Sequence, residues 1–200
     1  DLHVGAVGGY VSLIKLDPDL KPEYSHSVSG SVDLSKTVGQ VRMSLLVEGF
    51  YTYLKDVFFL EENGRDPLGN WLFTRRNGSG ATVAGINLEG SLSFSDKLWM
   101  QVGYTWQRSR YKEPEQWSEN PAISPQQKMF RTPDHYVSLK LDYDPLKNLK
   151  FSLSGIFTGP MLVQHLGDGE GRPDLQKKTP SFFELGIRVA FDFNLSRTVR

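Results

Sequence analysis

The feature that most constrains this chain is the regular alternation of apolar and polar residues over long stretches. In the segment SFFELGIRVAFDF, residues 181–193, bulky apolar side chains occupy every second position from Phe183 to Phe193, with charged or small residues between them. Successive side chains of an extended strand point to opposite faces, so the segment predicts a strand with one apolar and one polar face. The apolar face can meet a protein core or lipid, and the polar face bulk water or a water-filled lumen.

The same pattern recurs along the chain, whereas helical periodicity and helix caps are nearly absent. We therefore predict an all-β fold, an antiparallel up-and-down meander. A further short extended run, Tyr10–Leu16, lies in a segment that otherwise reads as loop. A strand of about 12 residues, tilted by ~40°, covers about 30 Å, enough for the ~25 Å apolar band of a membrane barrel. The predicted strands cover residues 25–35, 40–53, 82–94, 98–109, 135–143, 149–158 and 182–193.

Composition does not contradict a membrane location. The chain is 38% hydrophobic with a mean hydropathy of −0.38, and it has no apolar run near the ~18–20 residues of a membrane helix. Alternating barrel strands have the average hydropathy of a soluble protein. The 23 basic and 23 acidic residues balance, which argues against a nucleic-acid partner. With no cysteine, disulfides and thiolate sites are excluded, as suits an exported protein.

The connections between the predicted strands alternate in length. Long links over 55–80, 110–134 and 159–181 alternate with tight turns, so long loops gather at one end of the sheet and short turns at the other. Outer-membrane barrels have this asymmetry, with short periplasmic turns and long extracellular loops. Rings on the apolar face also gather at both ends of the strands, as in the aromatic girdles of a bilayer-spanning barrel. These rings are Phe94, Tyr143 and Phe193 at the turn end, and Tyr51, Tyr53, Tyr104, Trp106 and Phe157 toward the loop end.

Four local patterns resemble the C-terminal barrel region of TonB-dependent outer-membrane receptors. They are DLKPEYS at 19–25, EGFYTYLKDVF at 48–58, GINLEG at 85–90 and FRTPDHY at 130–136. Their order and spacing agree with the strand directions derived above. The resemblance implies that the chain is a segment of a 22-stranded transmembrane β-barrel.

The resemblance also implies an organisation and a function. Residues 1–200 are expected to form a partial β-barrel domain of about seven or eight strands, without the plug domain and the closing strands. Bacterial barrels have an even number of strands, so either Tyr10–Leu16 is the eighth or the chain is part of a larger barrel. The implied function is energised uptake of a scarce ligand such as a ferric siderophore, haem or cobalamin, not catalysis, and no cofactor is expected. The implied partners are outer-membrane lipid, the receptor's own plug domain, the TonB complex and a small ligand such as an iron chelate.

Cationic and aromatic side chains in or beside the long loops are the candidate ligand contacts. Arginine and aromatic rings can bind an anionic, aromatic iron chelate by ion pairing and stacking, although ordinary solvated loops contain such residues too. The candidates are Trp71, Arg75, Arg76, Tyr111, Trp117 and Arg131.

Two other functions remain open at this level. Asp134 and His135, with a serine such as Ser138, could form the site of a barrel hydrolase, but a turn at the start of a strand explains the pair better. Alternatively, the apolar face could be the core of a soluble β-sandwich or a lipocalin-like binding protein.

No metal site is expected. The four histidines lack the spacing of a metal pair. The segment GDGEGRPD, 167–174, offers Asp168, Glu170 and Asp174 as oxygen ligands, yet it lacks the final glutamate of a calcium loop and reads as a polar loop.

Overall fold

The structure is a computed structural model that describes residues 2–7, 10–118, 120–165, 167 and 171–193. Within this part of the chain, all regular secondary structure is β-strand. The strands are β1 (Leu2–Val7), β2 (Tyr10–Leu16), β3 (Tyr24–Val38), β4 (Val41–Lys55), β5 (Phe58–Arg65), β6 (Trp71–Asn77), β7 (Ala81–Phe94), β8 (Leu98–Glu115), β9 (Gln126–Lys128), β10 (His135–Leu146), β11 (Leu149–Thr158), β12 (Leu162–His165), β13 (Leu175–Lys178) and β14 (Phe182–Phe191).

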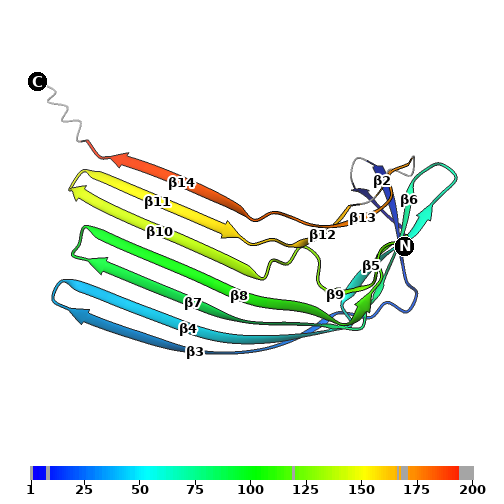
Figure 1. The fold of residues 1–200 in the computed structure, drawn as a ribbon, viewed down its shortest axis with the longest axis horizontal. Coiled ribbons are helices and arrows are strands. Elements are labelled where there is room, and N and C mark those ends of the chain that lie inside the picture. The colour runs from blue at the N-terminus through cyan, green and yellow to red at the C-terminus, as the bar shows by residue number, and fades with distance from the viewer. Residues whose placement is uncertain (1, 8–9, 119, 166, 168–170, 194–200) are drawn as a thin grey trace, which may run out of the picture.

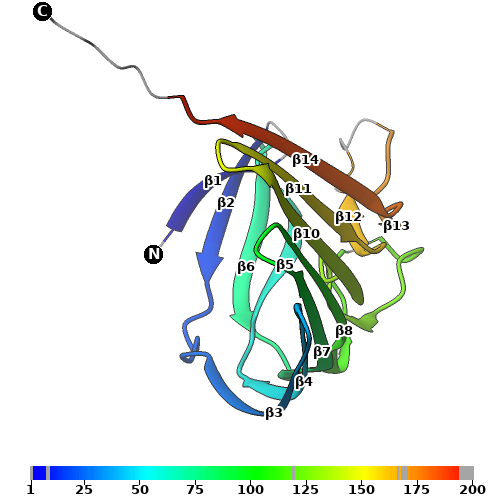
Figure 2. The same ribbon diagram turned by 90° about the vertical axis from the view of Figure 1, so that its left-hand side faces the viewer.

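Seven long strands form one antiparallel sheet in the order β14-β11-β10-β8-β7-β4-β3, and the short β9 also pairs with β8. They correspond one to one to the seven predicted strands, so the all-β antiparallel meander is confirmed. Figure 1 shows them side by side, and Figure 2 shows the sheet curving as an arc from β3 to β14. The arc does not close, which leaves β3 and β14 as edges.

Several strand ends differ from the prediction by two or more residues, and the differences at β8 and β14 follow directly from the pairing. β8 continues past residue 109 to Glu115, because it still pairs with β7 at Ala81 and Tyr111 and then with β9. The last strand, β14, ends at Phe191 rather than Phe193, because its partner β11 begins opposite at Leu149.

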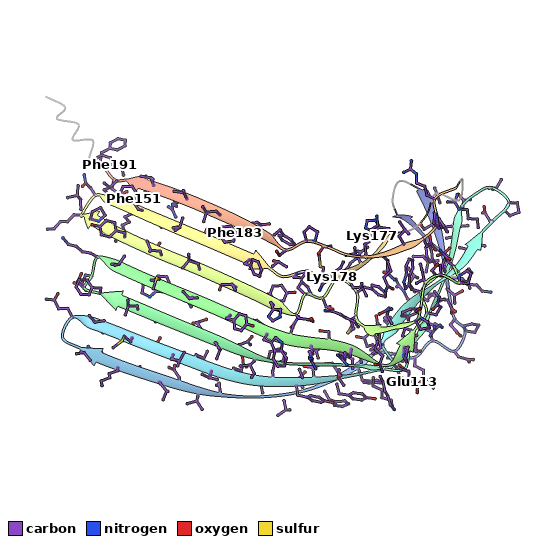
Figure 3. The ribbon with its side chains drawn as sticks, viewed as in Figure 1. Glu113, Phe151, Lys177, Lys178, Phe183 and Phe191 are labelled. Atoms are coloured by element: carbon purple, nitrogen blue, oxygen red, sulfur yellow. The ribbon has the colours of Figure 1, made fainter. Side chains whose placement is uncertain are left out.

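The register aligns the apolar residues of all seven strands on one face, which we call the apolar face; the opposite side is the polar face. Figure 3 shows Phe151 and Phe191 near the turn end of the sheet and Phe183 nearer the loop end. Polar side chains on the other side pair across strands, since Asn87 donates to Glu48 at 2.9 Å and accepts from Thr105 at 2.8 Å. One apolar row crosses the whole sheet through Val32, Val47, Leu88, Tyr104, Val137, Phe157 and Phe183.

The tight turns lie together at one end of the sheet, as predicted. β3 and β4 are joined by only two residues, and Gly39 there has φ 60°, a conformation that glycine adopts without strain. The turn between β7 and β8 has Ser95 at φ 55°, and β10 and β11 pair up to Leu146 and Leu149.

The long links are not plain loops, and this corrects the prediction. The link over 55–80 contains the hairpin β5–β6, and β2 joins β6 in parallel to give a four-stranded sheet in the order β1-β2-β6-β5. Tyr10–Leu16 is therefore a strand of this second sheet and not the missing eighth strand of the main one. The segment before it is not loop either, because Leu2–Val7 pairs with it as β1.

The buried hydrophobic side chains of the described residues lie at the loop end of the molecule. The edge strands β3 and β14 are exposed along almost their whole length, and Ile187 of β14 is 72% exposed, whereas the inner long strands are mostly half-buried. The buried hydrophobic residues are Val57, Phe59, Trp71, Phe73, Ala81, Trp117 and Ile123. Among the residues that the structure describes, the hydrophobic core therefore lies at the loop end and not along the long strands.

Candidate functional site

The candidate residues lie at the loop end, where the second sheet and the links around β9, β12 and β13 extend beyond the long strands (Figure 1). The pairing of β2 with β6, β5 with β6 and β8 with β9 brings side chains from distant segments together here. The loop end is therefore the candidate functional site.

Arg76 is the electrostatic centre of this region. Its Nε lies 2.7 Å from Glu61 on the neighbouring β5, and its Nη2 lies 3.3 Å from the buried Glu115 at the end of β8. Burial by itself lowers the pKa of Arg76, but ion pairing with Glu61 and Glu115 outweighs it, so the net direction is upward. The guanidinium also lies over the Phe59 ring, 4.9 Å from its centroid. The contacts of Arg76 connect the β5–β6 hairpin to the main sheet.

A small hydrophobic cluster fills the space beside Arg76. Phe59, Trp117 and Ile123 are buried together, with Tyr111 and Phe130 packed against them. Phe59 meets Tyr111 edge to face at 6.0 Å, and Trp117 meets Phe130 in the same way at 6.1 Å. Burial is the larger cause of a raised pKa at Tyr111, and the negative charge of Glu115 is the smaller one. The Tyr111 hydroxyl therefore stays protonated at neutral pH.

Asp174 connects two of the long links. Its carboxylate accepts a hydrogen bond from Ser118 Oγ at 2.5 Å and one from the Gly167 amide at 2.6 Å. Its backbone oxygen accepts from Asn120 Nδ2 at 3.2 Å. The link before β10 is therefore attached to the link before β14, and the loop end is held by side-chain contacts across the sequence.

Four of the six predicted ligand contacts take part in packing or ion pairs at the loop end. Trp117 is 2% exposed and donates from its indole to Gln176 at 3.3 Å. Trp71 is 5% exposed and carries the Arg65 guanidinium 4.1 Å from its ring centroid. Tyr111 and Arg76 have the contacts described above. These four side chains support the shape of the loop end.

The remaining two predicted contacts differ from each other in exposure. Arg131 is exposed, and its φ of 57° turns the chain between β9 and β10, where its amide donates to Leu162 O at 2.8 Å. Arg75 is half-buried on β6, opposite Leu16 of β2 and Leu60 of β5. The structure therefore does not bring all six candidates to one surface.

Several residues that organise the loop end were missed by sequence reasoning, namely Phe59, Glu61 and Glu115. A signal for the first two was present, because the segment DPLGN, 66–70, is a hairpin turn between two apolar runs. In the structure Asp66 Oδ1 accepts from the amides of Leu68 and Asn70, which fixes that turn. Glu115 had no such signal, since its role depends on distant Arg76.

The hydrolase pair does not form. The carboxylate of Asp134 binds Lys128 Nζ at 2.5 Å, whereas His135 Nδ1 is 2.9 Å from the Tyr104 hydroxyl and its ring stacks on that of Tyr104. With the aspartate paired elsewhere, it cannot orient the histidine as a general base.

Within the residues that the structure describes, no group of three or more histidine or acidic side chains is arranged to hold a metal ion. Asp168 and Glu170 of the calcium-loop candidate lie outside the described residues. In the same part of the chain, no helix has the length and apolar character needed to cross a membrane.

Comparison by sequence gives one family. The family model described as "TonB dependent receptor-like, beta-barrel" matches residues 4–200, nearly the whole chain. No curated protein matches the chain.

Comparison by structure gives matching folds at low sequence identity. The siderophore receptor PirA from Acinetobacter baumannii aligns with a TM-score of 0.56 and 18% identity, over 92% of this chain and 27% of PirA. The ferric-catecholate import receptor Fiu from E. coli K12 aligns with a TM-score of 0.59 and 16% identity, over 89% of this chain and 22% of Fiu. FpvA from Pseudomonas aeruginosa PAO1, bound to pyoverdine, aligns with a TM-score of 0.56 and 15% identity, over 85% of this chain and 23% of FpvA. The chain thus spans about a quarter of the length of these proteins.

Proposed function

The chain belongs to the TonB-dependent receptor-like β-barrel family, and from this we propose that it forms one section of the barrel wall of an outer-membrane uptake receptor. Members of this family are outer-membrane proteins and transporters rather than enzymes. The hydrolase and the soluble-binder alternatives are therefore wrong. The observation that carries the proposal is the seven-stranded sheet, which has a continuous apolar row on one face and paired polar side chains on the other.

In this proposal the apolar face meets lipid and the polar face lines the barrel interior. Backbone groups in a bilayer must be paired, so the open edges β3 and β14 require neighbouring strands from the rest of the receptor. Residues 1–200 are then a partial barrel domain. The receptor's other strands, its plug domain and its contact with the TonB complex lie in other parts of the protein.

The proposed cargo is a small iron chelate of the siderophore class. Three similar structures support it by their printed descriptions: a siderophore receptor, a ferric-catecholate import receptor and a receptor bound to pyoverdine. Their identity to this chain is below 20%, so they support the ligand class and no particular molecule. Haem and cobalamin are the alternative cargoes that the uptake experiment must distinguish from a ferric siderophore.

Two residues are proposed to contact this cargo directly. Arg131 is exposed at the loop end, and Arg75 is half-buried on β6. An arginine can hold an anionic chelate through paired hydrogen bonds. Trp71, Arg76, Tyr111 and Trp117 then act by holding the loops in place.

Uptake by cells tests the proposal. The complete receptor carrying this segment is produced in cells that lack other iron-chelate receptors, and uptake of radioactive iron is measured with ferric siderophores and with haem; labelled cobalamin is tested in parallel. Replacing Arg75 and Arg131 together by glutamine is expected to raise the half-saturating concentration at least tenfold, because each charged hydrogen bond contributes about 1.5–3 kcal/mol.

The matched control is Lys36→Gln, which removes a cation from β3 near the turn end. It is expected to leave uptake unchanged. Uptake of haem or cobalamin instead of a ferric siderophore would contradict the cargo, and uptake of none of them would contradict the receptor function. Unchanged half-saturation in the double variant would contradict the two contacts only.

A further inference from the structure

The apolar face changes character at the loop end of β8. On this face Tyr104 and Trp106 are followed, again at every second position, by the exposed cations Arg108, Arg110 and Lys112. Aromatic rings concentrate at the level of lipid headgroups, so cations directly beyond them on a lipid-facing surface reach the headgroup layer.

A polar depression of about 430 Å³ is lined by two of these cations, Arg108 and Arg110. Its lining includes Arg108 and Arg110 of β8 and Lys128 of β9, which stands opposite Arg110 in the register. The lining also includes Asp134, but its carboxylate is paired with Lys128 at 2.5 Å, so this pair is neutral. Within the described part of the chain no ion pair involves Arg108 or Arg110, and the depression therefore keeps two guanidinium charges.

A second, apolar depression of about 590 Å³ adjoins the first, because Arg108 lines both. Its floor is the cross-strand pair Gly30 and Gly49, where an added Cβ would meet no atom within 4 Å. Tyr51 and Trp106 are among its walls. Two missing side chains thus leave a groove in the apolar face at the level of the Trp106 ring.

We propose that these two depressions together bind one lipid with an anionic phosphate headgroup. The phosphate is held by Arg108 and Arg110, whose planar guanidinium groups match phosphate oxygens in pairs. An acyl chain lies in the glycine-floored groove. The charge of the polar depression and the continuity of the groove with the apolar face both favour a lipid over a soluble anion. This inference rests on the membrane placement proposed above.

Native mass spectrometry of the complete receptor in a neutral detergent tests the site. The probes are dimyristoyl phosphatidic acid and dimyristoyl phosphatidylcholine, which share their acyl chains and differ in the charge of the headgroup. The wild type is expected to retain phosphatidic acid in preference to phosphatidylcholine. Arg108→Gln with Arg110→Gln is expected to weaken its binding about tenfold to thirtyfold, since each cation near an anionic lipid contributes ~1 kcal/mol. Arg108→Lys with Arg110→Lys, which keeps both charges, is expected to be intermediate and checks that the site still folds.

Two leucine substitutions test the groove. Gly49→Leu fills its floor and is expected to weaken phosphatidic acid binding, whereas Gly90→Leu is the control, because Gly90 shares the apolar face and also has no atom within 4 Å of an added Cβ. Equal effects of the two leucines would contradict the proposal. Unchanged binding in the glutamine variant, or displacement of the lipid by an equal concentration of inorganic phosphate, would also contradict it. The assay needs neither cargo nor energy, so a failure of iron uptake alone leaves this result unaffected.

Discussion

At the scale of single residues, Arg76 and Glu115 show why the loop end keeps its shape. Glu115 is 6% exposed, and its two carboxylate oxygens are engaged separately: Oε2 by Arg76 and Oε1 by the amide of Ser79 at 3.0 Å. A buried carboxylate that loses its cation retains the cost of leaving water without the compensating attraction. The position of the β5–β6 hairpin against β8 therefore depends on Arg76.

Replacing Arg76 by methionine is expected to release the β5–β6 hairpin. The loss of charged hydrogen bonds to Glu61 and Glu115 corresponds to about 2 kcal/mol of local stability. Hydrogen exchange over β5 and β6 in the complete receptor measures this. Arg75→Met is the matched control from the same strand, and equal exchange in the two variants would contradict the role of Arg76.

The turn at Asp66 is expected to depend on pH. The side-chain hydrogen bond from Asn70 lowers the pKa of Asp66; burial opposes this, and the amides of Asn70, Leu68 and Gly69 add to the lowering. A carboxyl group with a lowered pKa stabilises the fold above its unfolded pKa of about 3.9, and this contribution is lost as the pH falls through the folded value. The amides of Leu68 and Asn70 should therefore lose protection at low pH, as measured by hydrogen exchange corrected for intrinsic rates. Asp66→Ala should show no such dependence, and protection retained below the folded pKa in the wild type would count against the prediction.

At the scale of elements, the strands are matched to each other by complementary side-chain sizes. Phe50 on β4 stands opposite Gly85 on β7, and its ring occupies the space above the glycine: an added Cβ would lie 2.6 Å from Phe50 Cζ and 2.3 Å from the Trp106 oxygen. An aromatic ring over a cross-strand glycine fixes register in designed sheets as well. Glycine is thus required at 85 by a close approach rather than by its backbone angles.

Gly85→Ala is expected to destabilise the β4–β7–β8 pairing by about 1–3 kcal/mol, because the new methyl group forces the ring and backbone apart. Gly90→Ala on the same strand is the control, since it has open space on the apolar face. Urea titration of the complete receptor in detergent, followed by the mobility of folded and unfolded bands on gels, compares the two. A similar urea midpoint for both variants would contradict the prediction that the close approach at Gly85 excludes a methyl group.

At the scale of the whole molecule, the chain is an open arc whose stability depends on its surroundings. The described side chains of β3 are exposed along the entire strand, and β14 is nearly as open. The buried hydrophobic side chains in the described part of the chain lie at the loop end of the arc. In the proposed receptor, lipid covers the apolar face and neighbouring strands pair with the two edges, as in a section of a barrel wall that has no core of its own.

Arginine substitutions at neighbouring positions of β10 test which face meets lipid. Leu139→Arg places a charge on the apolar face and is expected to cost about 2–4 kcal/mol in a bilayer. Ser138→Arg places the same charge on the polar face, where Ser138 is exposed, and is expected to cost little. Folding of the complete receptor into lipid vesicles under urea measures the difference. Equal costs, or a larger cost at Ser138, would contradict the membrane orientation.

Sequence reasoning predicted the main sheet well and the loop end poorly, and the reason is physical. Alternation from Leu98 to Trp106 and from Phe183 to Phe191 is a local property of an extended chain, so the strands, their faces and the tight turns could be predicted from neighbouring residues alone. The missed hairpin β5–β6 had a local signal in its turn at Asp66, which the length of the link obscured. The pairing of β2 with β6 had none, because it joins segments about sixty residues apart.

The sequence by itself therefore determined an antiparallel meander with one apolar and one polar face. Successive side chains of a strand point to opposite faces of the sheet, so the alternation assigns each residue to one face. Only the tertiary structure decided which loop residues are buried and which are accessible. Trp117 and Arg131 look equally available in the sequence, yet Trp117 is 2% exposed against Phe59 and Phe130, whereas Arg131 is open to solvent. Burial at the loop end depends on which distant strands meet there, and no local pattern carries that information.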